Sequence, residues 1–329
     1  MRAVQVAHPG GPEAMELVET ADPVPGSGDL LVAVAVAGVN YIDTYHRAGI
    51  YPQTPPFGLG LEGAGTVVGT GSDVTGFSVG DRVAWCDAPN SYAELVTVSA
   101  ERALRIPDGI SLEAAAGALL QGMTAHYLVD STYPVRQGES ILVHAAAGGV
   151  GLLLTQLAAR RGARVIGTVS TDRKARLAEE AGAAETVRYD RTDDLAAEIR
   201  ALTDGQGVPV VFDGVGRTTF DASLASLKPR GTMVLFGAAS GPVPPVDPQR
   251  LRLGGSLYLT RPALGDYIQT PEELEHHAQA VLGAVADGTL TIQIGQEYPL
   301  AEVRKAHEDL QSRRTTGKLL LRVSENRPD

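Results

Sequence analysis

The sequence predicts an α/β protein in which a domain built on a doubly wound parallel sheet is inserted into a β-rich, barrel-like domain. Three observations support this fold class. The first hundred residues hold short β-rich runs, strand and helix patterns alternate from residue 111 onward, and a last strand pattern lies far beyond that alternation. We therefore expect the two ends of the chain to build one domain together.

Size and charge limit the class of protein. The chain has 329 residues, and 28 Lys and Arg against 39 Asp and Glu give a formal net charge of -11. This negative charge repels nucleic-acid backbones and anionic lipid, so neither is an expected partner. The longest apolar run, residues 30–39, is too short to cross a bilayer, the N-terminus lacks a signal-peptide pattern, and Cys86 is the single cysteine. These features predict a cytoplasmic protein.

The pattern of the first hundred residues predicts strongly bent strands. The runs "LLVAVAVAGV", "GAGTVVGTGS" and "DRVAW" are punctuated by Gly, Pro and Asp, as expected for an irregular barrel. The first long helix is expected to begin after Ser111, which is suited to cap it, with Glu113 favourable in its first turn. This helix is predicted to connect the two domains.

The middle of the chain alternates strands and helices as a parallel sheet requires. Strands are expected at 140–145, 164–170, 185–190, 208–214 and 231–237, with helices at 149–162, 172–182, 192–203 and 218–228. The terminal strand after residue 317 is too distant to join this block easily, so we expect it to pair with the barrel. The predicted domains are residues 1–120 with 266–329, and residues 121–265.

A glycine-rich turn follows the first strand of this block. In "HAAAGGVG" the pattern Ala146-x-Gly148-x-x-Gly151 is a dinucleotide-binding fingerprint with alanine in its first position. Gly148 allows the backbone to approach a pyrophosphate, Gly151 allows close packing of helix on strand, and the helix N-terminus offers N–H groups to anionic oxygens. We expect Ala147, Gly149 and Val150 to line the same turn. The alternative is a tight packing turn that holds no ligand.

The end of the next strand favours NADPH over NADH. An Asp or Glu there would bind the ribose 2′-hydroxyl of NADH, but this chain has Ser170 and, four residues later, Lys174. A lysine ammonium can pair with a 2′-phosphate. Asp172 is contrary evidence, although its place at the start of a helix also suits a capping residue.

Several stretches together resemble NADPH-dependent quinone oxidoreductases of the medium-chain dehydrogenase/reductase superfamily, the group that includes zeta-crystallin. These stretches are "GVNYIDTYHRAGIY", "GLGLEGAGTVVGTGSDV", "GDRVAW", "HAAAGGVG", "FDGVGRTTFDASL" and "GSLYLTRPAL". They extend over nearly the whole chain. The resemblance implies a Rossmann cofactor domain inserted in a GroES-like catalytic domain.

The resemblance also implies cofactor contacts. Lys174 and Tyr189 occupy the places of residues that contact the adenosine phosphate, and Arg313 lies where relatives place an arginine near the cofactor. The strand end at Phe236 and Gly237 and the threonine at Thr124 correspond to residues beside the nicotinamide. Gln121 is a departure, because close relatives often carry a lysine there, and a neutral amide offers hydrogen bonds without the charge.

The same comparison predicts that no metal is bound. Zinc alcohol dehydrogenases of the superfamily have a cysteine at the place of Asn40 and a His-Glu pair at the places of Leu61 and Glu62, and their structural zinc lobe needs four cysteines. Without zinc to polarise an alcohol, hydride delivery to an already electrophilic quinone or α,β-unsaturated carbonyl is the expected reaction.

Candidates for the catalytic residues come from "NYIDTYHRAGIY". Asn40 is suited to donate its amide to the acceptor or to a ribose, or else to serve a turn. Tyr45 and Tyr51 are suited to stack on a flat quinone or donate a hydroxyl, or else to pack at the domain edge. Asp43 more plausibly orients its neighbours than acts as a base.

Other functions stay open at this point. Reduction of an enoyl thioester uses the same cofactor and hydride step, and a non-catalytic NADPH-binding structural or RNA-binding protein is an alternative of another class. The resemblance implies a homodimer that joins sheet edges of the cofactor domains, for which "GGSLYLT" at 254–260 offers an apolar strand, unless that strand is interior.

Overall fold

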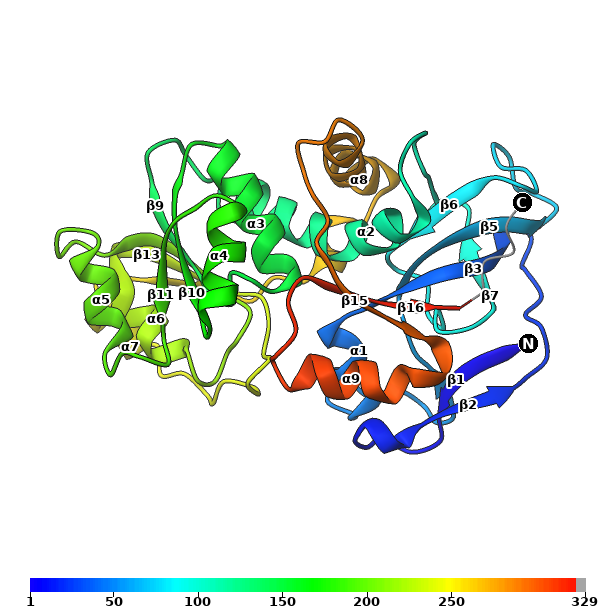
Figure 1. Ribbon diagram of the computed structural model, residues 1–329, viewed down its shortest axis with the longest axis horizontal. Coiled ribbons are helices and arrows are strands. Elements are labelled where there is room, and N and C mark those ends of the chain that lie inside the picture. The colour runs from blue at the N-terminus through cyan, green and yellow to red at the C-terminus, as the bar shows by residue number, and fades with distance from the viewer. Residues whose placement is uncertain (324–329) are drawn as a thin grey trace. The chain divides into compact units, whose positions relative to one another are not determined.

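Alternating valines and alanines make β3 (Asp29–Val39) the central strand of the first part of the chain, because every second side chain from Leu30 to Val36 is buried. The computed structural model describes residues 1–323 and divides into two units (Figure 1). Unit 1 contains Met1–Leu120 and the chain from Thr270 onward, and unit 2 contains Gln121–Gln269. The second junction was expected after residue 265 and lies after Gln269.

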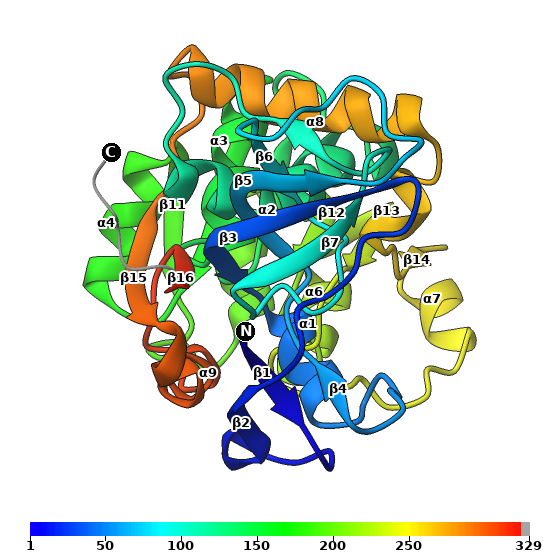
Figure 2. The ribbon, with the colours of Figure 1, turned by 90° about the vertical axis from the view of Figure 1, so that its right-hand side faces the viewer.

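Two sheets build unit 1. The larger has the order β15-β16-β3-β5-β6-β8, with β7 also paired to β3, and the smaller has the order β2-β1-β4. The strands are β1 (Arg2–Val6), β2 (Met15–Glu19), β4 (Phe57–Gly58), β5 (Glu62–Thr70), β6 (Arg82–Trp85), β7 (Leu95–Ser99), β8 (Leu104–Arg105), β15 (Ile294–Pro299) and β16 (Lys318–Arg322). Figure 2 shows β3, β5 and β7 running close together in this unit.

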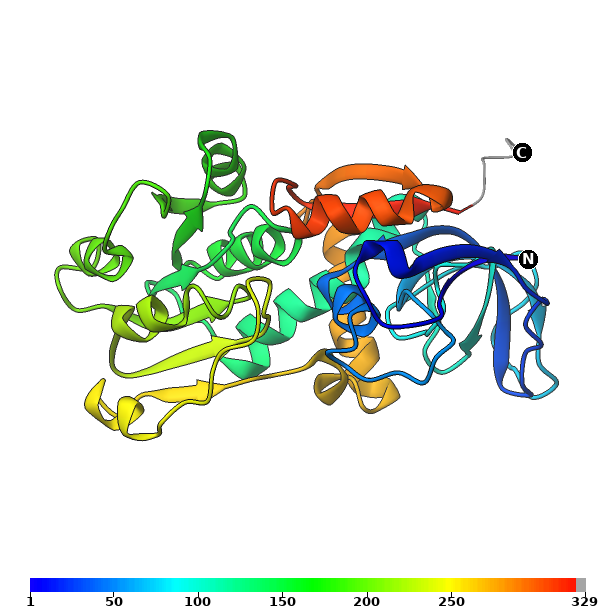
Figure 3. The same cartoon turned by 90° about the horizontal axis from the view of Figure 1, so that it is seen from below.

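The strand β16 joins the larger sheet of unit 1, as predicted. β16 pairs antiparallel with β3, with Leu319 opposite Val39, and parallel with β15. Figure 3 shows the C-terminal β15 and α9 (Val303–Gln311) among the N-terminal strands of unit 1. The core contains Trp85, Tyr92 and Tyr298 among aliphatic side chains from both ends of the chain.

The helices of unit 1 are short or peripheral to the sheets. Within residues 1–100, all of which the structure describes, the longest helix is α1 (Tyr41–Arg47), with 7 residues. Besides α9, this unit contains η1 (Pro12–Ala14), η4 (Leu300–Glu302) and α8 (Pro271–Ala286). The long helix α2 (Leu112–Tyr127) contains the junction at Leu120, and Ser111 Oγ accepts the Ala114 N–H at 3.1 Å as the predicted cap.

Unit 2 has the predicted doubly wound sheet. Six parallel strands run in the order β11-β10-β9-β12-β13-β14, with the reversal between β9 and β12. They are β9 (Ser140–Val143), β10 (Arg164–Val169), β11 (Ala183–Arg188), β12 (Val208–Asp213), β13 (Leu227–Leu235) and β14 (Tyr258–Thr260). The helices are η2 (Leu128–Thr132), α3 (Gly149–Arg160), α4 (Asp172–Glu180), α5 (Leu195–Ala201), α6 (Phe220–Ser226), α7 (Gln249–Leu253) and η3 (Leu264–Tyr267). The predicted fold class is confirmed.

Among the described residues, no helix has both the length and the hydropathy needed to cross a membrane.

Candidate active site

The glycine turn lies between β9 and α3, at the carboxyl end of the parallel strands. Gly148 is the N-cap of α3 and has no side chain to cap the first turn, so this turn offers its backbone N–H groups. A Cβ at Gly149 would collide with the side-chain oxygen of Gln121, and one at Gly151 would collide with the carbonyl oxygen of Ala145. The Gln121 side chain can shift, whereas the backbone cannot, so the close approach requires glycine at Gly151, and the turn fits the pyrophosphate of a dinucleotide.

Three predicted residues lie at the ends of the next two strands. Ser170 directly follows β10, Lys174 is in the first turn of α4, and Tyr189 directly follows β11. The Tyr189 N–H donates to the carbonyl of Val169 at 3.2 Å, which joins the two strand ends. Tyr189 is 43% exposed, so its ring is accessible to a ligand. Ligands of doubly wound sheets bind outside the carboxyl ends of the strands, where these residues lie.

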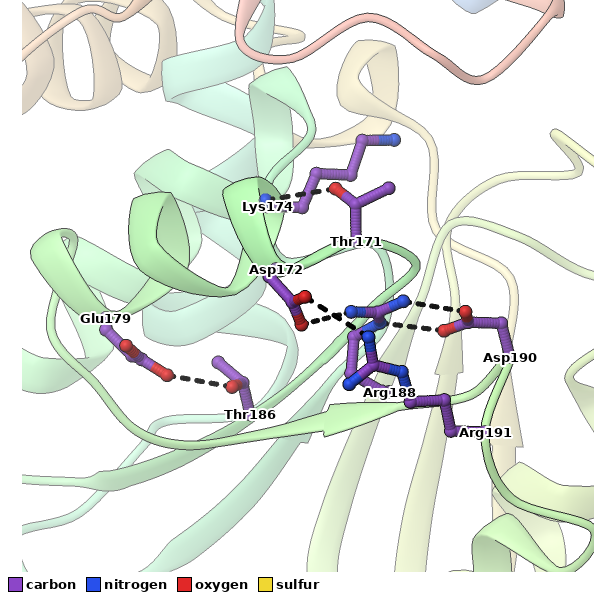
Figure 4. Close-up of polar contacts among 8 residues, drawn as sticks. All are labelled: Thr171, Asp172, Lys174, Glu179, Thr186, Arg188, Asp190 and Arg191. Atoms are coloured by element: carbon purple, nitrogen blue, oxygen red, sulfur yellow. Dashed lines mark hydrogen bonds and ion pairs between the residues drawn. The ribbon is translucent and has the colours of Figure 1, made fainter.

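Asp172 has a different role from the suggested cap. Thr171 is the N-cap of α4 and accepts the Lys174 N–H at 3.2 Å, whereas the Asp172 carboxylate pairs with Arg188 and, at 3.1 Å, with Arg191. Arg188 also pairs with Asp190 at 2.7 Å. The side chain of Lys174 extends away from this cluster (Figure 4). The negative charge of Asp172 is thus balanced by two guanidinium groups.

The remaining predicted residues of unit 2 lie on β13 and α2. Phe236 and Gly237 follow β13, and their N–H groups donate to the Asp213 carbonyl at 2.9 and 3.3 Å. Gln121 lies against Gly149, and Thr124, one helical turn later on α2, is buried. These residues are again next to the turn or at a carboxyl strand end.

A buried hydrogen-bond network supports these strand ends. Ser223 Oγ donates to Asp213 Oδ2 at 2.8 Å and accepts from His144 Nε2 at 2.9 Å, so Nδ1 accepts from Thr168 Oγ1 at 2.9 Å. Burial lowers the pKa of His144, against the opposing charge of Asp213, so the imidazole is neutral. The network connects β9, β10, β12 and α6, and its role is structural.

In unit 1, α1 carries Tyr45, and Tyr51 follows the helix. The rings of Tyr45 and Tyr51 meet edge to face with centroids 5.5 Å apart, and Tyr51 is 38% exposed. Tyr41, on the same helix, donates its hydroxyl to the Leu310 carbonyl at 2.9 Å. Arg313, which has a left-handed backbone with a φ of 58°, lies close enough to Tyr41 for its charge to act on that phenol. The tyrosine rings and the Arg313 guanidinium therefore lie near one another beside α1.

The Asp43 carboxylate is hydrogen-bonded to its neighbours. Its Oδ2 accepts the Asn40 N–H at 2.8 Å and the Tyr92 hydroxyl at 2.7 Å, while Oδ1 is buried without a hydrogen-bond partner. Burial raises the pKa of Asp43 to about 7, although these hydrogen bonds and the charge of Lys318 act in the opposite direction. Asp43 therefore fixes the backbone at the start of α1.

The chain of contacts continues behind Asp43. Tyr92 Oη lies 3.4 Å from His307 Nε2, and Arg47 donates to His307 Nδ1 at 3.0 Å. Because a guanidinium only donates, Nδ1 is the acceptor and the proton of the neutral ring is on Nε2. Burial and the charge of Arg47 lower the pKa of His307 to about 3.

Asn40 belongs to a buried cluster that the sequence did not reveal. Its Oδ1 accepts from Lys318 Nζ at 2.8 Å, its Nδ2 donates to Glu62 Oε2 at 2.9 Å, and Lys318 Nζ also contacts that carboxylate. The signals that would have found it are a lysine in the apolar strand pattern "KLLLRV" and a glutamate at the start of an apolar strand. Each long charged side chain needs a partner when buried.

This donor set does not fit a zinc ion. At the positions that hold zinc ligands in zinc alcohol dehydrogenases, Asn40 and Leu61 offer neither a thiolate nor an imidazole. The Glu62 carboxylate is bound to the Lys318 ammonium. Lys318 and Glu62 are 1% and 0% exposed, so the positive charge beside this carboxylate is internal to the protein. The arrangement has no place for a Lewis acid at Glu62.

The comparisons with known proteins agree with this architecture. The family model "Alcohol dehydrogenase GroES-like domain" matches residues 26–108, and "Zinc-binding dehydrogenase" matches residues 149–277. A quinone oxidoreductase of Pseudomonas aeruginosa is 47% identical over 97% of this chain and 99% of its own length. A 2-haloacrylate reductase of a Burkholderia species is 39% identical over 95% and 96%. A mycobacterial protein solved in complex with NADPH is 50% identical, with a TM-score of 0.96 over 98% of this chain and 100% of its own.

These relatives extend over both units, and the glycine turn, the strand ends and the terminal strand of unit 1 all have the architecture that the resemblance implied. The chain therefore belongs to the quinone oxidoreductase family of the medium-chain dehydrogenase/reductase superfamily, a family of oxidoreductases.

Proposed function

We propose that this chain is an NADPH-dependent reductase of quinones and related α,β-unsaturated carbonyls that works without zinc. The observation that carries the proposal is the carboxyl edge of the unit 2 sheet. There an uncapped glycine turn lies beside two strand ends that present a hydroxyl, an ammonium and an accessible phenol. A mycobacterial relative solved with NADPH supports this choice of cofactor.

The residues of unit 2 would hold NADPH as follows. The N–H groups of Gly149, Val150 and Gly151, in the first turn of α3, bind the pyrophosphate, because the start of α3 is electropositive. The Gly148 N–H donates to the Ala145 carbonyl at 2.8 Å, so Gly148 contributes close approach of its backbone instead. Lys174, Ser170 and Tyr189 bind the 2′-phosphate, and the pairing of Asp172 with Arg188 and Arg191 reduces the repulsion that a carboxylate would cause there.

Further contacts are proposed for the rest of the cofactor. Thr124, Phe236 and Gly237 face the nicotinamide, Ala147 and Val150 line the turn, Gln121 offers a neutral amide, and Arg313 contacts an adenosine phosphate. NADPH, when bound, supplies a hydride.

The residues of unit 1 would hold the acceptor. Tyr45 and Tyr51 offer aromatic surface on which a flat quinone can stack, and Tyr51, which is partly exposed, also carries a hydroxyl that can donate. Asn40 contributes a side-chain amide in a fixed orientation, and Asp43 holds the backbone that carries it. With no Lewis acid to activate an alcohol, the acceptor must already be electron-poor. The 2-haloacrylate reductase among the relatives is named for a substrate of this kind.

The proposal is tested by NADPH and NADH oxidation against a panel of quinones, enones, 2-haloacrylate and enoyl thioesters. We expect turnover with quinones and enones, and at least about tenfold higher kcat/KM with NADPH than with NADH. Preferential turnover of enoyl thioesters would establish the alternative reductase. If no acceptor is reduced, a non-catalytic role is favoured, and salt-sensitive RNA binding would then be measured.

We also propose a homodimer formed through β14 and a location in the cytoplasm. β14 is the last strand in the sheet order of unit 2, and Tyr258 on it is 62% exposed. An exposed strand edge with aromatic surface favours pairing with a second copy. Light scattering of the wild-type protein and of Leu259→Pro, which disrupts the edge, tests the dimer; a monomeric wild type would refute it.

A further inference from the structure

The buried cluster of Lys318, Glu62 and Asn40 brings together segments that are distant in sequence. Lys318 begins β16, Glu62 begins β5 and Asn40 follows β3. The second oxygen of Glu62 accepts the Leu120 N–H of α2 at 2.7 Å. All of these residues lie in unit 1, so four of its segments meet at one ion pair.

Stability alone does not explain this ion pair. Removing two charges from water costs several kcal/mol per ion, and apolar residues of similar volume often hold two elements together equally well or better. The neighbouring residues of β16, Leu319, Leu320 and Leu321, already fill the core around it and are at most 1% exposed. For packing alone, an apolar side chain in place of Lys318 would serve at this position without the cost of removing charges from water.

The charges provide a defined orientation of the Asn40 amide. An ammonium only donates hydrogen bonds and a carboxylate only accepts them. Oδ1 of Asn40 must therefore face Lys318, and Nδ2 must face Glu62, as the distances of 2.8 and 2.9 Å record. With an apolar pair the amide would lose these two partners, and the Gly38 carbonyl, 3.4 Å from Nδ2, would hold its orientation less firmly.

The space beside Glu62 and Lys318 is closed on the side of Gly38. A Cβ at Gly38 would collide with Glu62 Oε2 and approach Lys318 Nζ and the Ala116 carbonyl to 2.8 Å each. The Asn40 backbone is fixed at the same time, because its N–H donates to Asp43 at the start of α1. Side chain and backbone of Asn40 are thus held by separate partners.

We propose that Lys318 is a positioning residue for acceptor reduction: through its ion pair with Glu62 it holds the Asn40 amide in the one orientation that the reaction uses. The inference rests on the proposed function, in which Asn40 contacts the acceptor. It assigns to β16 a role in the reaction beyond completing the sheet. Lys318 itself contacts neither substrate nor cofactor in this proposal.

The test compares two paired substitutions. Lys318→Met/Glu62→Gln removes the ion pair without leaving a buried charge, and Arg322→Met/Glu297→Gln removes the 2.5 Å ion pair at the other end of β16 without touching Asn40. We expect kcat for a quinone to fall at least about tenfold in the first variant, because small misplacements of reacting groups carry large rate costs. NADPH affinity, measured by fluorescence titration, should stay within about twofold in both.

A second measurement does not depend on turnover. In wild-type protein labelled with ¹⁵N, the Asn40 side-chain amide, assigned by its loss in Asn40→Asp, should give one slowly exchanging NH₂ pair. In Lys318→Met/Glu62→Gln this pair should exchange with solvent much faster, whereas Arg322→Met/Glu297→Gln should leave it unchanged. If wild-type protein reduces no acceptor, the proposed function fails, and the exchange measurement still decides whether Lys318 orients Asn40.

A near-isosteric single variant covers the case in which the double variant does not fold. In Glu62→Gln, an amide oxygen that accepts from Leu120 leaves an NH₂ group facing both Asn40 Nδ2 and Lys318 Nζ. This clash of donors should lower kcat at constant NADPH affinity and speed the exchange of the Asn40 amide. Unchanged kcat and unchanged exchange in either variant would overturn the positioning role, as would a loss of kcat that only follows weaker NADPH binding.

Discussion

Asp43→Asn should make unit 1 less sensitive to pH than the wild-type protein. The wild-type carboxyl is fully buried, accepts hydrogen bonds on Oδ2 only, and has a pKa raised to about 7 by that burial. An asparagine has nearly the same shape, and its carbonyl oxygen can accept both hydrogen bonds. It mimics the protonated carboxyl and never ionises.

The pKa shift of Asp43 determines both the sign and the size of the pH dependence of the unfolding free energy. The folded pKa of about 7 lies above the ordinary value of 3.8, so the folded protein binds the proton more tightly than the unfolded chain. The stabilisation is complete below pH 3.8 and is lost as the pH rises through 7. The difference in unfolding free energy between wild type and Asp43→Asn should therefore shift by about 3 kcal/mol in favour of wild type between pH 8 and pH 5.

His307 acts in the opposite direction but is present in both proteins. Its pKa of about 3 lies below the ordinary 6.5, so its contribution is complete above pH 6.5 and is lost as the pH falls toward 3. The comparison of wild type with variant cancels this term to the extent that the two groups are independent.

Trp85 fluorescence provides the assay. It is the single tryptophan of the chain and is fully buried in the core of unit 1, so urea titrations followed at this residue report the unit that contains Asp43. The exposed Asp108, replaced by Asn, is the matched control and should follow wild type at every pH. A difference between wild type and Asp43→Asn that is constant from pH 5 to pH 8 would refute the reasoning.

Three further predictions concern unit 2 and the metal. Lys174→Glu should weaken NADPH binding at least about tenfold and NADH binding much less, whereas Arg173→Glu, on the same helix, should have a small effect; equal losses for both cofactors would contradict the phosphate assignment. Gly151→Ala should lower NADPH affinity because its Cβ meets the Ala145 carbonyl, while Gly283→Ala, which meets no atom within 4 Å, should not; titrations of both variants decide. Elemental analysis of purified protein should find no stoichiometric zinc, and one zinc per chain would overturn the mechanism.

The regular parts of the fold were predictable because each depends on a local pattern. The strands and helices of unit 2 follow from alternating periodicities, and the glycine turn from its place between β9 and α3. The pairing of β16 with the barrel was also predictable, since an apolar strand needs a sheet and this strand is too distant from the doubly wound block to join it easily. In each case the sequence carries the signal within a short window.

The polar clusters were not predictable, because their members meet only in the folded chain. Asp172 looked like a helix cap, yet Thr171 caps α4 and the carboxylate pairs with Arg188 and Arg191. Glu62 was noted only as the remnant of a ligand pair, and its partner Lys318 lies far along the chain. Single charges of this kind have many possible partners, and no periodicity selects among them.

The pairing of β16 with β3 has a consequence for how the chain acquires its structure during synthesis. Unit 2 is one continuous segment and can fold as soon as it emerges, whereas Asn40 and Lys318 are 278 residues apart. The first half of the barrel must therefore wait, with residues 36–39 of β3 unpaired on one side and Glu62 without its counter-ion, until β16 has left the ribosome. A nascent chain stopped before residue 318 should hold a folded insert and an incomplete barrel, which makes the addition of β16 the step that removes an aggregation-prone strand edge.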